Sequence, residues 1–406
     1  MYLLFAWRYF KGKKTATAIN IISWVTTGVI AFATCCQILV LSVFNGFEDL
    51  VKSLYSSFYT DLKVIPAKGK TITFTDARIA QLKKHPGIHD LSLIAEEKAL
   101  LKNEDAQSVV YIKGVDDNYQ KVSGVPSKIT RGKFNTGTED EPQLIVGAGI
   151  QNATGIMLND EFAAQYLTII LPKKNEAGSD PFQSLSEGNV TASGVFTIQQ
   201  DFDNKYALTN MAFVKRQMGL TANEYTAAEI KLKYGANEAD VQESLQQLLG
   251  NQYIVQTKYQ QNSNLYNTMR LEKWAIYAVL TLILIICAFN MVSALTMLVL
   301  EKKQDIAILQ SMGSTKSQVR RIFLAEGLLL TGLGAFSGIA LASIICFLQV
   351  KFHLVKLKGG SFLIDYFPVK LIATDFLLVT GTAAAIALLA SWYPARKAAK
   401  QPLELR

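Results

Sequence analysis

Cysteine and histidine are scarce in this sequence. All four cysteines lie in strongly apolar runs (Cys35, Cys36, Cys287 and Cys346). A small disulfide scaffold is therefore excluded, and the large polar segment must fold without disulfides. Of the three histidines, His85 and His89 have the spacing of a helical metal site, but Pro86 and Gly87 stand between them and would break that helix. We therefore expect no metal site.

Charged residues are also few. They make up 18% of the chain, against about 25% in a typical soluble domain, whereas 50% of the chain is hydrophobic, which excludes a disordered chain. The apolar residues gather in four charge-free runs, at 15–47, 274–300, 327–350 and 376–395. A helix needs roughly 20 apolar residues to cross a hydrocarbon core of about 30 Å, and every run is long enough. For a single run a buried core helix is the alternative, but four runs together predict transmembrane helices.

The basic residues of the short segments predict the orientation of these helices. Segments 1–18, 301–322 and 394–406 carry 13 lysines and arginines in total, whereas loop 351–373 carries four. We therefore expect both termini to be cytoplasmic. The net charge of +8 reflects this bias and gives little support to nucleic-acid binding. The first run is too long for the apolar part of a cleaved signal peptide, so we interpret it as a retained anchor.

These patterns predict an α-helical membrane protein with four transmembrane helices and a large α+β extracytoplasmic domain between helices 1 and 2. The predicted order is a cytoplasmic N-terminal segment (1–18), transmembrane helix 1 (19–47), a periplasmic domain with stalks (48–272), transmembrane helix 2 (273–300), a cytoplasmic loop (301–322), transmembrane helix 3 (323–350), a periplasmic loop (351–373), transmembrane helix 4 (374–393) and a cytoplasmic tail (394–406).

Segment 48–272 alternates strand-like with helix-like stretches, which indicates an α+β domain. Apolar residues recur at helical spacing from Leu50 to Phe58, and Gln260–Glu272 leads into the second apolar run, so two stalk helices should extend the first two spans. The strand-like runs are 62–65, 91–94, 108–113, 167–171, 194–199, 229–234 and 253–259, and the helix-like stretches are 76–84, 209–218 and 238–249.

One long polar loop, Lys173 to Asn189, lies between two strand-like runs. Two interpretations stay open. The loop is either a hairpin tip without a binding role or a protruding arm that grips a partner, because long loops in compact domains are often functional.

The loop after the second apolar run contains a short amphipathic pattern. Ile306, Leu309 and Met312 recur at helical spacing, and Gly313 supplies a helix stop. Thr315 followed by Gln318 predicts a capping box for the next helix. The apolar face of the short helix either rests on lipid or inserts into a groove of a partner protein.

Small residues recur at four-residue spacing in the third and fourth runs, as in Gly334, Gly338 and Ala342, and predict close helix packing within the chain rather than a dimer seam. Few ionisable residues enter these runs, which argues against a proton or ion pathway. Glu326 is the exception, and we expect it to reach the interface or to pair with Arg320 or Arg321.

Catalytic patterns are missing. The sequence contains no G-x-x-x-x-G-K-[ST] loop and no recognisable Ser/His/Asp set. We therefore expect neither an enzyme nor a cofactor-binding protein, and any ATP hydrolysis should take place in a separate subunit.

Several segments resemble the LolC/LolE-type permeases of the lipoprotein-releasing ABC system, within the wider FtsX/MacB-like permeases. The resemblance spans both ends and all four apolar runs, and the Asn45–Gly46–Phe47–Glu48 element is its most specific part. The similar segments are Trp7–Phe10, Ile22–Trp24, Leu41–Glu48, Lys303–Gly313, Asp365–Pro368 and Tyr393–Ala399.

The resemblance implies a permease of the bacterial inner membrane that forms a dimer with an identical or related chain and binds cytoplasmic ABC ATPase subunits. It would extract lipoproteins from the outer leaflet by mechanotransmission and pass them to a periplasmic lipoprotein carrier. The alternatives are an FtsX-like regulatory permease that controls a cell-wall hydrolase or sensor, and a MacB-like export permease.

The resemblance also implies site residues. The ATPase would be contacted by a coupling helix that ends at Gly313 (Asp305, Ile306, Ile308, Leu309 and Met312). The arm would bind the carrier, although it keeps little of the family's proline- and arginine-rich character (Lys173, Lys174, Pro181 and Phe182). One further set of residues would line the site where lipid enters, and the alternative is that they are ordinary interfacial aromatics (Val43, Phe44, Phe47, Phe362, Tyr366 and Phe367).

Overall fold

The computed structural model describes residues 17–158, 165–174, 184–357 and 366–400. The chain divides into two compact units, a helical unit (Met1–Leu50 and Asn267–Arg406) and a sheet unit (Val51–Tyr266). Each unit is described by itself below.

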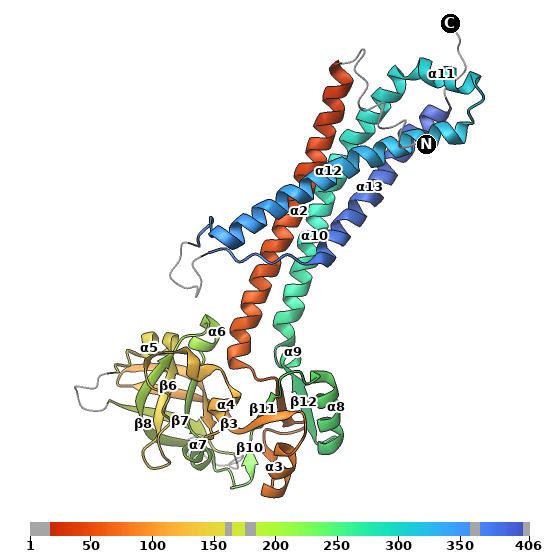
Figure 1. Ribbon diagram of the computed structural model, residues 1–406. Coiled ribbons are helices and arrows are strands. Elements are labelled where there is room, and N and C mark those ends of the chain that lie inside the picture. The colour runs from red at the N-terminus through yellow and green to blue at the C-terminus, as the bar shows by residue number, and fades with distance from the viewer. Residues whose placement is uncertain (1–16, 159–164, 175–183, 358–365, 401–406) are drawn as a thin grey trace. The chain divides into compact units, whose positions relative to one another are not determined.

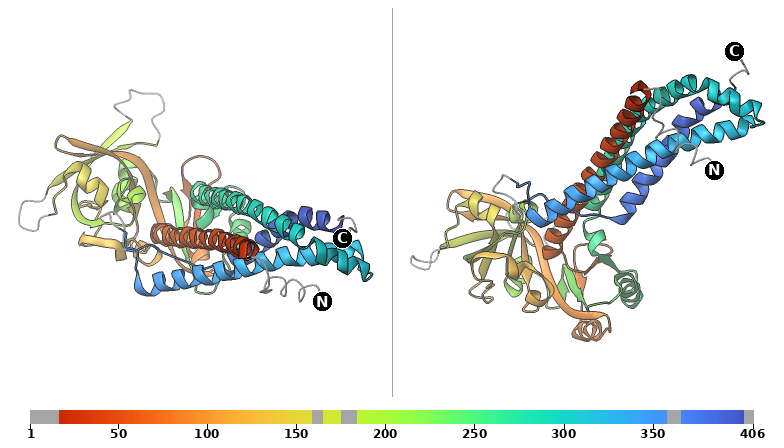
Figure 2. Two further views of the ribbon diagram at one scale, coloured as in Figure 1. Left: turned by 90° about the horizontal axis from the view of Figure 1, so that it is seen from above. Right: turned by 45° about the horizontal axis from the view of Figure 1, so that its top comes forward.

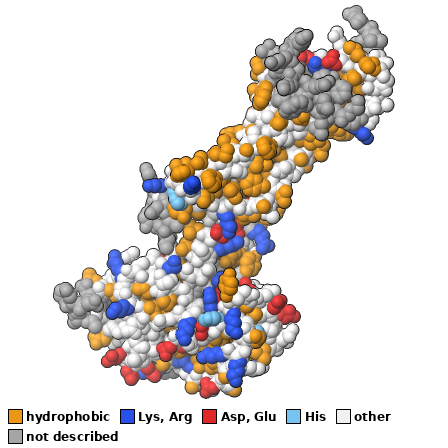
Figure 3. All heavy atoms as spheres, in the orientation of Figure 1, with side chains coloured by type: hydrophobic (Ala, Val, Ile, Leu, Met, Phe, Trp, Pro, Cys, Tyr) orange, Lys and Arg blue, Asp and Glu red, His pale blue; other side chains and the backbone are white. Residues whose placement is uncertain are grey.

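The helical unit is built on four long helices that run side by side (Figures 1 and 2). Within the described residues, these four are the helices long and apolar enough to cross a membrane. They are α2 (Thr17–Phe58), α10 (Ser263–Glu301), α12 (Lys316–Phe352) and α13 (Ala373–Ala399), with the short α11 (Lys303–Ser311) between α10 and α12. Apolar side chains cover much of the visible face of the helical unit (Figure 3).

Glycines in α12 allow close packing against α2. A Cβ added to Gly338 would lie 2.3 Å from the Ala31 carbonyl oxygen, and one added to Gly334 would lie 2.9 Å from the Thr27 carbonyl oxygen. Gly334, Gly338 and Ala342 are all buried inside this single chain. The predicted packing of small residues within the chain is therefore confirmed for this stretch.

Glu326 corrects a prediction. Its side chain does not pair with Arg320 or Arg321, because it is 3% exposed while both arginines are exposed. Among the described residues, its Oε2 atom has no hydrogen-bond partner. The reason is its place on the inner face of α12, in the same buried stripe as Phe323 and Leu330.

The sheet unit contains one ten-stranded sheet and a two-stranded sheet among its described residues. The strands are β1 (Leu62–Pro66), β2 (Ile72–Thr73), β3 (Ile88–Asn103), β4 (Ala106–Val115), β5 (Ile129–Gly132), β6 (Gln143–Gly147), β7 (Tyr166–Pro172), β8 (Leu185–Phe196), β9 (Tyr206–Asn210), β10 (Glu224–Tyr225), β11 (Ala227–Leu232) and β12 (Tyr253–Thr257). The helices are α3 (Asp76–Lys83), α4 (Tyr119–Val122), η1 (Val125–Lys128), α5 (Ala148–Thr154), α6 (Gln200–Asp203), α7 (Met211–Met218), α8 (Glu238–Leu249) and α9 (Lys258–Gln261).

The large sheet has the order β12-β1-β11-β3-β4-β9-β6-β8-β5, and β7 pairs with β3 and β8. Helices α3 and α8 pack on a core around Leu62 and Ile230, whereas α5 and α7 pack on a second core around Ile112 and Leu144. The predicted α+β architecture and every predicted strand are present, and the long β3–β4 hairpin extends the predicted strand 91–94 as far as Asn103. Strands β2, β5, β6, β9 and β10 were not predicted.

Where the two stalk helices were predicted, α2 extends to Phe58, and α10 begins at Ser263, directly after the short α9. Within the sheet unit the residues at their ends are tied together. The Lys258 ammonium lies 3.1 Å from the Asp61 carboxylate, and the Gln261 side chain donates to the Thr60 carbonyl oxygen at 3.0 Å. The chain therefore enters and leaves the sheet unit at two neighbouring segments, which are hydrogen-bonded to each other.

Candidate functional site

Helix α11 presents one face to solvent and one to the helical unit. Ile306 is 2% exposed and packs among residues of α10, α12 and α13, whereas Ile308 is 53% and Met312 is 78% exposed. Asp305 is held 3.1 Å from Lys302, one turn before it. The outward apolar surface of α11 is therefore formed by Ile308 and Met312.

This arrangement corrects the expectation that Ile306, Leu309 and Met312 share the partner-facing side. Ile306 points into the bundle, Leu309 is half-buried, and Met312 follows the last helical residue. The helix stop at Gly313 is confirmed, because its φ of 93° suits glycine. The predicted capping box is also present, with Thr315 and Gln318 bonded reciprocally at the start of α12.

At the other end of the helical unit, Gly46 of α2 touches the segment that precedes α13. A Cβ on Gly46 would lie 2.3 Å from the Pro368 carbonyl oxygen, and the Lys370 amide donates to the Ser42 carbonyl oxygen at 2.9 Å. Phe47 meets Phe367 edge-on, with ring centroids 5.8 Å apart. Two motifs that are more than 300 residues apart in the sequence thus form one junction, which we call the Gly46 junction (Ser42, Asn45–Phe47 and Phe367–Lys370).

A charged cluster lies beside the Gly46 junction and joins three long helices. Lys273 of α10 lies 2.9 Å from Asn45 Oδ1 and 3.2 Å from Asp375 Oδ1, and Asn45 Nδ2 donates to Asp375 Oδ2 at 2.6 Å. Asn45 is 2% exposed and Asp375 is 9% exposed. Sequence reasoning missed Lys273 and Asp375, because each stands at the margin of an apolar run and gives no local signal.

The residues expected at a lipid access site lie partly in this region. Val43, Phe44, Phe47, Tyr366 and Phe367 are half-buried, and the structure brings Phe47 and Phe367 together. Tyr366 instead packs on His353 at the end of α12, with ring centroids 3.8 Å apart. Phe362 lies outside the described residues.

The expected carrier-binding arm is a hairpin, but it is shorter than predicted. Strands β7 and β8 pair from Tyr166–Thr191 to Pro172–Leu185, so residues 185–189 belong to β8 rather than to the loop. Lys173 bonds back to the Ser184 carbonyl oxygen through its amide, and the Lys174 side chain pairs with Glu224. Pro181 and Phe182 lie outside the described residues.

Where α2 ends in the sheet unit, its last turn packs on a buried cation. The Lys113 ammonium lies 2.7 Å from Glu229 Oε1 and about equally far, at 4.8 and 4.9 Å, from the ring centroids of Phe58 and Tyr119. Burial alone would lower the pKa of Lys113, but Glu229 outweighs it and raises that pKa above its ordinary value. The last residue of α2 therefore packs against the buried Lys113–Glu229 ion pair.

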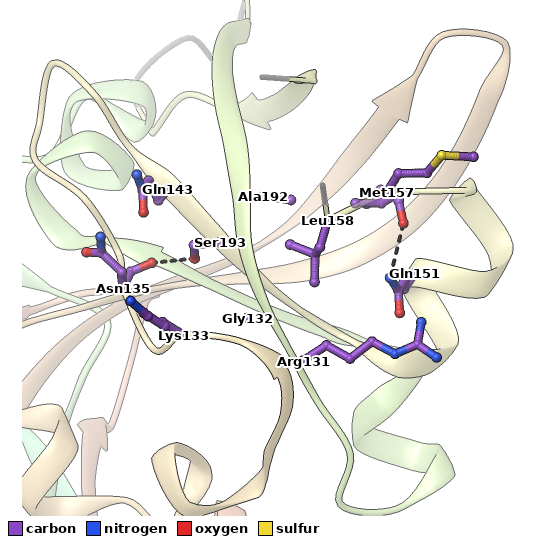
Figure 4. A pocket seen from close by; sticks show the side chains of 11 residues that line it. Arg131, Gly132, Lys133, Asn135, Gln143, Gln151, Met157, Leu158, Ala192 and Ser193 are labelled. Carbon is purple, nitrogen blue, oxygen red and sulfur yellow. Dashed lines mark hydrogen bonds between the residues drawn. The ribbon is translucent and has the colours of Figure 1, made fainter. Parts of the chain in front are cut away.

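A cavity of about 910 Å³ opens in the sheet unit beside β5 and β8 (Figure 4). Arg131 and Lys133 line it, and no carboxylate does among the described residues. Its walls are held by bonds from Ser193 Oγ to the Asn135 carbonyl oxygen (2.6 Å) and from Gln151 to the Ile156 carbonyl oxygen (3.1 Å). Its charge favours anions over cations.

Comparison with known proteins covers the whole chain. Residues 23–248 match the MacB-like periplasmic core domain family, and residues 277–403 match the FtsX-like permease C-terminal family. The lipoprotein-releasing system transmembrane protein LolE of Haemophilus influenzae is 27% identical, over 98% of this chain and 97% of its own length. The corresponding LolC proteins of Xylella fastidiosa and Neisseria meningitidis are each 26% identical, over 98% and 100% of this chain and 96% and 99% of their own lengths.

Proposed function

Because this chain belongs to the MacB-like periplasmic core domain family and is a permease of the LolC/LolE type, we propose that it extracts lipoproteins from the outer leaflet of a bacterial inner membrane. It would act as the membrane-spanning subunit of an ABC transporter and pass the lipoprotein to a periplasmic carrier. The observation that carries this proposal is that lipoprotein-releasing relatives match the chain from end to end.

The physical task explains why such a system needs ATP. Each acyl CH₂ group buried in a membrane contributes about 0.8 kcal/mol, so a lipoprotein with several acyl chains does not leave spontaneously. ATP hydrolysis would take place in separate cytoplasmic ATPase subunits, and a second permease chain, identical or related, would complete the dimer.

In this proposal the four long helices span the membrane with both termini in the cytoplasm. The bias of lysine and arginine toward segments 1–18, 301–322 and 394–406 supports this orientation. The sheet unit and the Gly46 junction would then face the periplasm, and α11 would lie at the cytoplasmic surface.

Helix α11 would receive the mechanical stroke of the ATPase. Ile308 and Met312 offer an exposed apolar surface to a groove on the partner, with Asp305 and Leu309 at its margin. Ile306 is buried in the same cluster as Val299 of α10 and Val319 of α12, so a displacement of α11 is transmitted into both helices. The helices α2 and α10 then continue into the sheet unit without a break.

The remaining site residues are assigned on the same basis. The tip of the β7–β8 hairpin would dock the carrier, with Lys173 and Lys174 at its base. The aromatic pair Phe47 and Phe367 and the neighbouring Val43 and Phe44 would border the place where the lipid anchor enters.

Depletion of the chain in its native cell tests the proposal. Lipoproteins should accumulate in the inner membrane within a few generations, and they should be released again when the chain is supplied from a plasmid. Normal lipoprotein export in depleted cells would contradict the proposal, and a defect in cell-wall hydrolysis alone would favour a regulatory permease instead.

A further inference from the structure

The two halves of α10 are packed very differently. No residue between Ser263 and Ile283 is buried. All buried residues of this helix lie in its second half (Leu284, Ala288, Met291, Ala294, Leu295, Leu298 and Val299). The second half is therefore part of the helical core, because it shares one apolar cluster with α12 and α13. The first half, by contrast, lies on the bundle without being enclosed by it.

The contacts that join this first half to α2 and α13 include three that involve its side chains. Thr281 accepts from the Gln37 side chain at 3.3 Å, and Tyr277 is half-buried against the cluster of Leu41 and Val379. The third contact is Lys273, which reaches both Asn45 and Asp375. Lys273 is the charged one of these three, and it joins α10 to both α2 and α13.

This cluster consists of an ion pair and hydrogen bonds, which can break and form again. Lys273 and Asp375 carry opposite charges, and Asn45 uses both ends of its amide, donating to the carboxylate and accepting from the ammonium. A cavity of about 200 Å³ lies directly against the pair, lined also by Leu41, Trp274 and Leu378. A polar cluster at the margin of a membrane segment is expensive to leave unsatisfied, and its presence there indicates a role beyond packing.

We propose that Asn45, Lys273 and Asp375 form a latch that holds the first half of α10 against α2 and α13, and that this part of α10 moves away from α13 when the latch opens. The latch positions α10 and does not contact the ATPase. The inference deepens the proposed function, on which it rests for the purpose of the motion: opening would separate α10 from α13 beside the Gly46 junction and admit an acylated substrate from the membrane.

The test measures a distance within one chain, so it needs neither lipoprotein nor ATPase. Spin labels are placed at Leu271 and Leu377, which are 71% and 74% exposed and each lie two residues from a latch residue. They are introduced as unnatural amino acids, which leaves the native cysteines in place. The full chain is studied in lipid nanodiscs and diluted with unlabelled chain, so that each distance comes from one protomer.

The chain with native latch residues should give one narrow distance distribution. Lys273→Met and Asp375→Asn should each add a population at longer distance. The matched control is Asp49→Asn, which removes the exposed Lys370–Asp49 pair near the same end of the helical unit and should leave the distribution unchanged.

The exchanged pair Lys273→Asp/Asp375→Lys is the decisive variant. Because the Asn45 amide can turn over and satisfy both groups again, the exchange should restore the narrow distribution. If both single variants keep the narrow distribution, or if the exchanged pair stays as broad as the single variants, the latch is refuted.

Thermal unfolding of every variant is recorded first. If Asp375→Asn does not fold, Lys273→Gln replaces it, because the Lys273 side chain is 29% exposed and tolerates change.

A second measurement connects the latch to transport. In the complex reconstituted with its ATPase subunit, Lys273→Met should lower lipoprotein release several-fold for each ATP hydrolysed, and the exchanged pair should recover it. If the native complex releases no lipoprotein, the proposed function fails while the distance result still decides whether the latch exists.

Discussion

Gly46 and Pro368 are in backbone contact although one lies within the first long helix and the other just before the last. A Cβ on Gly46 would lie 2.3 Å from the Pro368 carbonyl oxygen, which no real Cβ could tolerate. The contact brings the chain at Lys370 within hydrogen-bond distance of Ser42. The position of Asp375, and with it the charged cluster, therefore depends on the absence of a side chain at residue 46.

Gly46→Ala should destabilise the helical unit by about 1–3 kcal/mol, the usual range when extra volume is forced into a packed site. The matched control is Gly28→Ala in the same helix, where nothing lies within 4 Å. In that open position alanine should instead stabilise by roughly 0.5–1 kcal/mol, because glycine is the poorer helix former. Thermal unfolding of both variants in the same detergent gives the comparison, and equal shifts would contradict the close contact.

Local patterns in the sequence predicted most of the elements, because alternation, helical spacing and caps are properties of neighbouring residues. The Thr315–Gln318 capping box and the strand at 62–65 are examples. The charged cluster could not be predicted in this way, since Lys273 is 228 residues from Asn45 and 102 from Asp375. Helical spacing likewise located α11 but wrongly placed Ile306 on its outward face, because the orientation of the helix depends on which helices pack beneath it.

The exposed face of α11 gives a prediction about coupling. Ile308→Asp and Met312→Asp should each reduce transport-linked ATP hydrolysis by at least tenfold, because a charge would have to enter the apolar groove of the partner. Both side chains are more than half exposed, so the melting temperature of the isolated chain should not change. The same measurements on Ile306→Asp serve as the contrast: this variant should lose helical stability, because Ile306 is buried among α10, α12 and α13.

If Ile308→Asp and Met312→Asp leave coupled hydrolysis intact, the ATPase does not bind this face. A loss caused by Leu309→Asp alone would indicate that the contact surface is rotated toward Leu309, which is half-buried in the isolated chain.

The buried Lys113–Glu229 ion pair below the end of α2 predicts that removing one charge destabilises the sheet unit far more than removing both. Lys113→Ala leaves Glu229 buried without its cation and should destabilise the sheet unit by about 3–5 kcal/mol. The double variant Lys113→Met/Glu229→Gln keeps similar volumes without charge and should recover most of that loss. Hydrogen exchange of β4 and β11 amides measures both effects, and a double variant as unstable as Lys113→Ala would show that packing rather than charge is responsible.

Asp61 predicts how the connection between the two stalk ends responds to acid. Burial by itself would raise its pKa, but the Leu232 amide at 2.9 Å and the Lys258 ammonium at 3.1 Å outweigh burial and lower the pKa below the ordinary value of 3.8. A carboxyl group whose pKa is lower in the folded state contributes stability above its unfolded pKa, and this contribution is lost as the pH falls through the folded pKa. Asp61→Asn should therefore cost about 1.5–3 kcal/mol at neutral pH, the range for hydrogen bonds to a charged group. The stabilities of variant and parent should converge as the pH falls below the ordinary pKa of 3.8 and through the lower folded-state pKa. The control is Asp105→Asn in the exposed β3–β4 turn, which should have the same stability as the parent at neutral pH. A constant difference between the Asp61 variant and the parent from pH 7 to pH 2 would show that the Asp61 charge does not stabilise the connection.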